Sequence, residues 1–232
     1  RWQALSERAA IQGIPVSSAP MFEQWLTGRS PVSSIAMADL VGVPSPTYIK
    51  IRRLCDVVLA LVLLAPVLLV IGLAAILIRL ESPGSAIFVQ RRVGFRRRPF
   101  TCFKLRSMRN DMAGSAFTAA QDARITRVGR VIRKLHIDEL PQIFNVLRGD
   151  MSWIGPRPEC VGLASQYRRS IAGYNYRYMV PPGITGWAAV HQGNVGGVDA
   201  ALIKLEYDFY YIRNLSPWID LLIVFKTLRV TL

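Results

Sequence analysis

The chain has 232 residues, 51% of them hydrophobic, and carries a formal net charge of +14 at pH 7. This length fits one domain of ordinary size plus an appendage, and the apolar content excludes a disordered chain. The excess of Lys and Arg favours anionic partners, which include nucleic acid, phosphorylated molecules and the acidic surface of a membrane.

Residues 1–47 differ in composition from the remainder of the chain. Residues 13–16 are typical of a short strand and residues 19–26 of a short helix, and the prolines and serines between residues 31 and 46 indicate a linker. Because this stretch alone cannot bury a core, we expect it to be the end of an upstream domain plus a linker. The chain would then be a fragment of a longer polypeptide, with residues 48–232 forming its main domain.

An uncharged apolar run, residues 57–78, follows a basic flank that contains Arg52 and Arg53. The run is long enough to cross the hydrocarbon core of a membrane. Pro66 lies in its middle, where it removes a backbone hydrogen bond and should break a helix. The flank at residues 79–98 is as basic as the first one, whereas a spanning helix normally has one basic side. We therefore predict a re-entrant helix, with a membrane-spanning helix and a buried soluble helix as alternatives.

The same distribution of cations argues against a nucleic-acid partner. A nucleic-acid-binding protein would present its Lys and Arg side chains along one soluble face. Here many of them flank an apolar segment instead. Membrane lipids are therefore the better candidates for the anionic partner.

Two short strands, residues 86–90 and 100–104, surround Gly94 and predict a β-hairpin. Lys104 and Arg106 end the second strand on one face, because strand side chains alternate between faces. Both cations are therefore candidates for binding a phosphate, although a single Lys or Arg is more often a surface cation.

A polar loop is expected at residues 109–121, and apolar residues then recur at helical spacing between residues 125 and 135. Arg and Lys occupy the opposite side of this predicted helix. The pattern suits a helix that lies on an anionic surface as well as one that packs on a core.

Two neighbouring carboxylates, Asp138 and Glu139, follow this helix. We predict that a second helix begins with Asp138 as its N-cap, which places Pro141 in the first turn, where proline is tolerated. In one interpretation the two acids only stabilise the helix start. In the other they face a pocket, in which one carboxylate acts as a nucleophile and the other binds a divalent cation together with substrate phosphates.

Arg157 lies between Pro156 and Pro158. Prolines restrict the backbone on both sides, which reduces the entropy lost when the guanidinium binds a phosphate; an exposed turn arginine is the alternative. Arg133, five residues before Asp138, could reach the same pocket. Further on, residues 200–213 and a segment that begins at the Ser216-Pro217 pair are expected to be helices.

Seven motifs occur in an order that is highly specific. They are Lys50–Asp56, Phe103–Met108, Gly129–Arg133, Ile137–Gln142, Phe144–Ser152, Gly155–Pro158 and Pro182–Trp187. Together they resemble the bacterial sugar transferases of the monotopic phosphoglycosyl transferase type, and the resemblance covers residues 48–225.

The resemblance implies the transfer of a sugar-1-phosphate from a UDP-sugar to a polyprenyl phosphate such as undecaprenyl phosphate, with release of UMP. It implies that Asp138 forms a phosphosugar-aspartyl intermediate and that Glu139, with Asp138, holds Mg²⁺. Lys104, Arg133 and Arg157 fall where the family places phosphate-contacting cations. The reaction would be the first membrane step of exopolysaccharide, capsule, O-antigen or glycoprotein glycan assembly.

The resemblance also implies a fold and a location. The expected fold is an α+β, mostly helical monotopic membrane protein with a re-entrant helix, amphipathic interfacial helices and a small β-hairpin. The expected location is the bacterial inner membrane, with the catalytic domain on the cytoplasmic face. The oligomeric state stays open, a homo-oligomer included, and a non-catalytic membrane scaffold of a polysaccharide assembly machine is the rival function.

Two departures from the family pattern are visible. The family often breaks its membrane helix with Ser-Pro, whereas this chain has Ala65-Pro66. After Val190, many members carry an Asn-Gly-Arg-Asn stretch with an arginine near the donor, where this chain reads His-Gln-Gly-Asn at residues 191–194. Donor contacts in that stretch therefore cannot be transferred, and the sugar stays unassigned.

Overall fold

A computed structural model of the chain describes residues 2–13, 18–32, 45–109, 122–192 and 197–231. In chain order the elements are α1 (Trp2–Ile11), α2 (Ala19–Thr27), α3 (Pro46–Glu81), β1 (Ile87–Val93), η3 (Phe95–Arg97), β2 (Pro99–Leu105), α4 (Arg127–Lys134), η4 (Ile137–Gln142), α5 (Ile143–Arg148), β3 (Ser152–Ile154), α6 (Val161–Ser170), η5 (Tyr174–Met179), β4 (Gly183–Thr185), α7 (Trp187–Gln192), α8 (Val198–Arg213) and α9 (Pro217–Thr231), where η denotes a 3-10 helix. The predicted α+β, mostly helical fold is confirmed.

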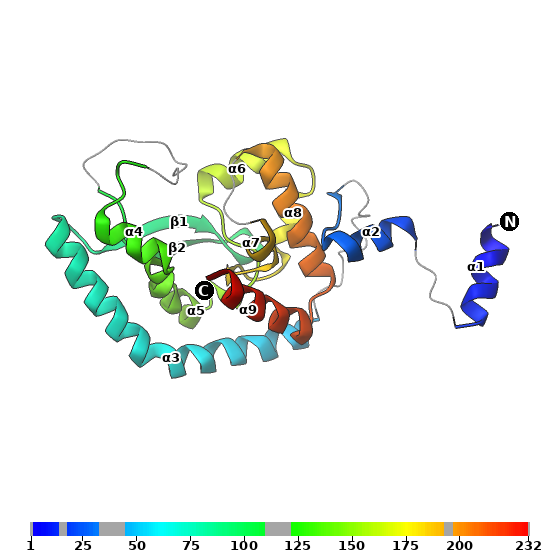
Figure 1. Cartoon of the computed structure of the whole chain (residues 1–232), viewed down its shortest axis with the longest axis horizontal. Helices are drawn as coiled ribbons and strands as arrows, with labels where there is room; N and C mark the ends of the chain where they lie inside the picture. Colours follow the sequence, from blue (N-terminus) through cyan, green and yellow to red (C-terminus); the bar gives the residue numbers. More distant parts are fainter. Residues whose placement is uncertain (1, 14–17, 33–44, 110–121, 193–196, 232) are drawn as a thin grey trace.

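The longest element, α3, curves along one side of the folded domain (Figure 1). Its buried apolar positions are mostly small, which lets other elements approach closely: Ala60 packs in a cluster with residues of β2 and α5, and Ala74 in one with residues of β2 and α4. The remaining apolar side chains of α3 are largely exposed, and by length and composition α3 could cross a membrane. An exposed apolar surface of this extent indicates a partner such as lipid.

The predicted break at Pro66 was wrong for the secondary structure, because α3 continues through this residue without interruption. Proline removes one backbone donor and crowds the carbonyl of the preceding turn. A long helix can absorb this by bending, and α3 follows an arc (Figure 1).

Strands β1 and β2 form the predicted antiparallel hairpin, in which Phe88 pairs with Lys104. Asn145 of α5 ties the hairpin to the rest of the domain. Its side-chain oxygen accepts from the N–H of Phe103 (3.1 Å), and its Nδ2 donates to the carbonyl of Thr101 (2.7 Å). The strand that carries Lys104 is thereby fixed against the segment that carries the two neighbouring acids.

Asp138 is not the N-cap of a regular helix, which corrects the prediction. His136 has a left-handed backbone (φ 54°) and precedes the 3-10 helix η4, which contains both acids and Pro141. The α-helical segment α5 begins only at Ile143. Since proline lacks the N–H that an α-helical turn needs beyond its first residues, the turn before Ile143 adopts the tighter form.

The short strands β3 and β4 pair in parallel, and Gly155 follows β3 at a very close backbone crossing. A Cβ on Gly186 would lie 2.1 Å from the carbonyl oxygen of Gly155. A Cβ on Gly183 would lie 2.1 Å from the backbone nitrogen of Gly155. Glycine is therefore required at these positions by close approach of two backbones. This crossing places the loop that carries Arg157 beside β4.

Replacing Gly186 by Ala is expected to lower the free energy of unfolding by about 3 kcal/mol, since backbone must shift to admit the methyl group. Gly162→Ala on α6 is a matched control, because a Cβ there meets no atom within 4 Å. That change should be neutral or stabilise the protein by up to about 1 kcal/mol. Thermal unfolding in detergent would compare the variants, and equal stability of Gly186→Ala and wild type would contradict the close crossing.

Helices α6 to α9 and η5 form the largest apolar core, with Leu205, Phe209 and Ile223 completely buried. The helices expected at residues 19–26 and 200–213 are confirmed as α2 and α8. The helix expected at Pro217 is confirmed as α9, with the hydroxyl of Ser216 accepting from the N–H of Ile219 (3.4 Å). The strand expected at residues 13–16 and the loop expected at residues 109–121 fall almost wholly outside the described residues.

Candidate active site

The two neighbouring acids have different surroundings in η4. Glu139 is engaged by cations on both of its oxygens, whereas the nearest ion-pair contact of Asp138 is Lys104 Nζ, 4.0 Å from Oδ2. Both side chains are mostly buried, with 13% of Asp138 and 11% of Glu139 exposed. Among the described residues, Asp138 is therefore the acid that keeps more of its lone pairs available to another molecule.

Glu139 is held by one residue from β2 and one from the loop after β3. Lys104 Nζ donates to its Oε1 (2.8 Å). Arg157 Nη1 donates to its Oε2 (3.0 Å), and Arg157 Nη2 donates to its Oε1. Arg157 Nη1 also donates to the carbonyl of Ile184 in β4 (3.3 Å). The arginine thus binds the carboxylate through two nitrogens, a geometry that lysine cannot reproduce.

The electrostatics separate the two acids. Burial raises the pKa of Asp138, and the charge of Glu139 adds to this, while Lys104 acts in the opposite direction. Burial would also raise the pKa of Glu139, but Arg157 and Lys104 outweigh it and hold this pKa well below its usual range. Burial lowers the pKa of Lys104. Such a separation of two adjacent carboxyl groups is typical of sites in which they have different roles.

Two further cations, Arg133 and Arg106, were also predicted from the sequence to bind phosphate. Arg133 forms no hydrogen bond or ion pair with the acids among the described residues, although its charge lowers the pKa of Asp138. Arg106 does not join the pocket, which corrects the expectation drawn from strand alternation. Its buried guanidinium donates to the carbonyls of Ser82 (2.6 Å) and Pro83 (2.6 Å), where it caps the end of α3.

Arg52 and Arg53 flank the apolar run as expected, but their side chains turn into the protein. Arg52 Nη2 donates to the hydroxyl of Ser152 in β3 (2.9 Å). Arg53 Nη2 donates to the carbonyl of Leu147 near the end of α5 (2.8 Å). The two arginines therefore anchor α3 to the domain; the sequence pattern had placed them beside lipid.

The residues present fit a magnesium ion shared with a substrate. The described residues contain no cluster of three or more Asp, Glu, His or Cys side chains, so they build no complete protein cage for a metal. Mg²⁺ often needs only one or two carboxylates together with substrate phosphates and waters. A carboxylate offers about four lone-pair positions, and Glu139 accepts three hydrogen bonds from Lys104 and Arg157. Asp138, together with the remaining lone pair of Glu139, could complete such a site.

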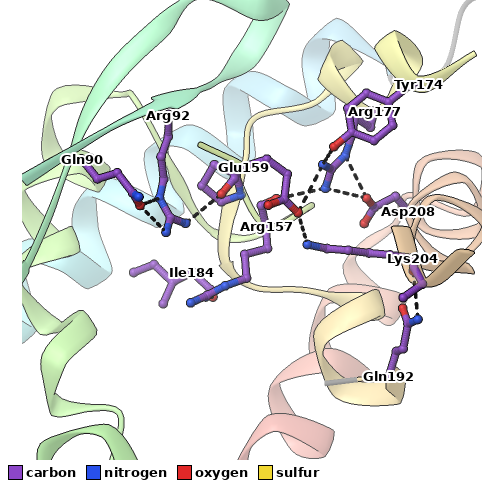
Figure 2. A network of polar contacts seen from close by, with 12 residues as sticks. Gln90, Arg92, Arg157, Glu159, Tyr174, Arg177, Ile184, Gln192, Lys204 and Asp208 are labelled. Carbon is purple, nitrogen blue, oxygen red and sulfur yellow. Dashed lines mark hydrogen bonds and ion pairs between the residues drawn. The ribbon is translucent and has the colours of Figure 1, made fainter. Parts of the chain in front are cut away.

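The loop that carries Arg157 is supported by a buried network that the sequence motifs do not predict. Arg177 of η5 donates to the carbonyl of Arg157 (2.9 Å) and pairs with Asp208 of α8 (2.8 Å), and Lys204 of α8 pairs with Glu159 (Figure 2). These residues come from three segments that lie far apart in the chain, and no local pattern predicts that the segments pair with one another. The one available signal was the density of arginines and aromatic residues between residues 167 and 180.

Comparison with known proteins shows a family for this sequence. A family model described as bacterial sugar transferase matches residues 47–232. The chain is 47% identical over 237 residues to UDP-N-acetylgalactosamine-undecaprenyl-phosphate N-acetylgalactosaminephosphotransferase of Aeromonas hydrophila, with 100% of this chain and 55% of the relative covered. It is 43% identical over 185 residues to UDP-glucose:undecaprenyl-phosphate glucose-1-phosphate transferase of Escherichia coli K12, with 76% and 39% covered.

For a third relative, the match covers a larger share of the relative's length. The chain is 44% identical over 180 residues to UDP-glucose:undecaprenyl-phosphate glucose-1-phosphate transferase of Caulobacter vibrioides, with 76% of this chain and 67% of the relative covered. The chain spans about half or less of the length of the Aeromonas and Escherichia proteins. The names of these relatives include more than one sugar.

Proposed function

Because the chain belongs to the bacterial sugar transferase family, we propose that it transfers a sugar-1-phosphate from a UDP-sugar to undecaprenyl phosphate. The products are UMP and undecaprenyl-diphosphate-sugar. The observation that carries the proposal is the buried acid pair, in which Glu139 is held by Lys104 and Arg157 while Asp138 keeps lone pairs available. The names of the curated relatives support the same class of donor and acceptor.

In the proposed mechanism Asp138 is the nucleophile. One of its carboxylate oxygens attacks the β-phosphorus of the UDP-sugar, and the bond from this phosphorus to the bridging oxygen breaks as UMP leaves. The resulting acyl phosphate is a phosphosugar-aspartyl intermediate. An oxygen of undecaprenyl phosphate then attacks the same phosphorus and releases the carboxylate. Covalent catalysis divides one difficult transfer into two easier steps.

The neighbouring cations stabilise the negative charge of the donor phosphates in this mechanism. Arg157 and Lys104 present fixed cations in a mostly buried setting, where their stabilisation of phosphate oxygens is stronger than in water. Arg133 is proposed to contact the phosphates once the donor is bound. Glu139, with Asp138, would hold Mg²⁺, which would neutralise diphosphate charge as a Lewis acid.

The position of α3 supports attachment to one side of a membrane. Near its start, Tyr48 donates to Asp220 of α9 (2.8 Å). Near its end, Ile78 packs in one cluster with Leu105 and Ile132. A spanning helix would separate its two ends by a hydrocarbon core of about 30 Å, which conflicts with contacts from both ends to one soluble domain. We propose that α3 is re-entrant at the inner membrane through its bend (Figure 1), without a break in the helix, and that the domain lies on the cytoplasmic face.

Cysteine labelling would test this topology. In a variant without Cys55, Cys102 and Cys160, single cysteines at Lys50 and Leu80 should both react with a membrane-impermeant maleimide from the cytoplasmic side of sealed vesicles. Neither should react from the opposite side until the vesicles are opened with detergent. Labels on opposite sides would show that α3 spans the membrane.

A donor panel tests the function itself. Purified protein, undecaprenyl phosphate and Mg²⁺ are incubated with UDP-glucose, UDP-galactose, UDP-GlcNAc and UDP-GalNAc in turn, and released UMP is measured. We expect lipid-dependent turnover with at least one donor. A fully folded protein with no turnover on any donor would favour the rival function, a non-catalytic scaffold of a polysaccharide assembly machine.

A further inference from the structure

The loop formed by Pro156, Arg157, Pro158 and Glu159 is held through its carbonyl groups. Prolines lack an N–H, so half of this loop cannot donate a backbone hydrogen bond. All four carbonyls accept one instead. In the same order, the donors are the N–H of Gly183 (3.0 Å), Arg177 Nη2 (2.9 Å), Arg92 Nη1 (2.7 Å) and the N–H of Val93 (3.0 Å). The backbone that carries the Arg157 side chain is therefore held from three separate parts of the fold.

Arg177 is the most constrained of these donors. Its side chain and that of Asp208 are each 2% exposed. Nε donates to Asp208 Oδ2 (3.0 Å), Nη1 donates to the hydroxyl of Tyr174 (2.6 Å), and Nη2 donates to the carbonyl of Arg157. Each guanidinium nitrogen thus has a fixed protein acceptor. In Figure 2 the guanidinium of Arg157 points away from this network toward Ile184, while its backbone lies beside Arg177.

The charges of the four ion-paired side chains in this network balance. Arg177 and Lys204 carry two positive charges, and Asp208 and Glu159 carry two negative charges, with all four groups largely buried. A neutral cluster of this kind has no spare cation with which to bind a phosphate. Arg177 therefore differs from Arg157, whose guanidinium lies at the candidate site.

We propose that Arg177, held by Asp208, is a positioning residue for Arg157, and this inference rests on the proposed function. The hydrogen bond from Arg177 to the carbonyl of Arg157 fixes the backbone from which the Arg157 side chain extends. That backbone position determines where the guanidinium of Arg157 meets Glu139 and the donor phosphates. A misplacement of about 1 Å in such a group can reduce the rate about a hundredfold. Buried ion pairs contribute little to stability compared with apolar residues of similar volume, so stability alone does not account for this pair.

Arg177→Lys is the first test. Lysine keeps a positive charge for Asp208 but cannot hold three acceptors with a planar fork. We expect kcat to fall about tenfold to a hundredfold, with the KM for the UDP-sugar changed less than about threefold. Arg169→Lys, at an exposed position of α6, is the matched control and should be unchanged.

A double-mutant cycle separates positioning from general damage. If Arg177 acts through Arg157, adding Arg177→Lys to Arg157→Ala should cost less than about twofold further. If the combined variant instead loses kcat by the product of the two single-variant losses, the proposal is overturned. Should Arg177→Lys fold poorly, the double variant Arg177→Met/Asp208→Leu removes both charges together and should fold while still losing activity.

Hydrogen exchange gives a readout that needs no turnover. In Arg177→Lys, amide exchange should become faster at the N–H groups of Val93 and Gly183, which donate to carbonyls of this loop, and stay unchanged in α5. Unchanged exchange at both N–H groups together with unchanged kcat would refute the positioning role. If folded wild-type protein is inactive, the proposed function is refuted. The exchange rates then still show whether Arg177 holds the loop that carries Arg157.

Discussion

Replacing Asp138 by Asn is expected to reduce phosphosugar transfer at least about a thousandfold, the scale on which removal of a catalytic nucleophile acts. The amide has nearly the same shape but lacks the negative charge and is a far weaker nucleophile. Because the side chain is only 13% exposed and close to Lys104, the change removes a buried charge without opening a cavity. Turnover with an accepted UDP-sugar and undecaprenyl phosphate measures the loss.

Asp199→Asn makes the same chemical change at an exposed position at the start of α8 and should retain full activity. Thermal unfolding of Asp138→Asn should match wild type within a few degrees. Substantial turnover by a folded Asp138→Asn protein would remove Asp138 from the role of nucleophile.

Arg157→Lys is expected to reduce kcat about tenfold to a hundredfold, and Arg157→Ala about a hundredfold to a thousandfold. The arginine reaches both oxygens of Glu139 and the carbonyl of Ile184, and a lysine ammonium cannot keep all of these contacts. Loss of the guanidinium also leaves the buried Glu139 with Lys104 as its remaining hydrogen-bonded cation. The pKa of Glu139 should therefore rise toward its usual range.

Steady-state kinetics with varied UDP-sugar would measure these effects. Arg169→Lys and Arg169→Ala serve as controls at an exposed position. Near-normal kcat in both Arg157 variants would show that the loop has a structural role only.

Elements with strong local signals could be predicted from the sequence. The hairpin around Gly94 and the helix start at Pro217 depend on neighbouring residues, and both are confirmed. Asp138, Glu139 and Arg157 could be named as candidates from the sequence, as a carboxylate pair and a proline-flanked arginine, although each also had a purely structural interpretation. The structure adds that Arg157 and Glu139 are in direct contact.

Other features depend on contacts between distant segments. Arg52 and Arg53 followed the pattern of a membrane flank, yet nearby carbonyl and hydroxyl groups of the domain accept their hydrogen bonds. The pairing of Arg177 with Asp208 joins η5 to α8, and no local pattern identifies either residue as a partner. At Pro66 a strong local signal gave the wrong prediction, because the long helix α3 accommodates the proline by bending.

A phosphosugar covalently attached to Asp138 is the key intermediate of the proposed mechanism, and one measurement detects it most directly. Wild-type protein is mixed with an accepted UDP-sugar and Mg²⁺ in the absence of undecaprenyl phosphate, and both UMP and intact protein mass are followed. The two-step mechanism predicts one UMP per active site and a mass gain of one phosphosugar, labile to hydroxylamine and absent in Asp138→Asn. Active protein that releases no UMP and gains no mass until lipid is added would contradict it.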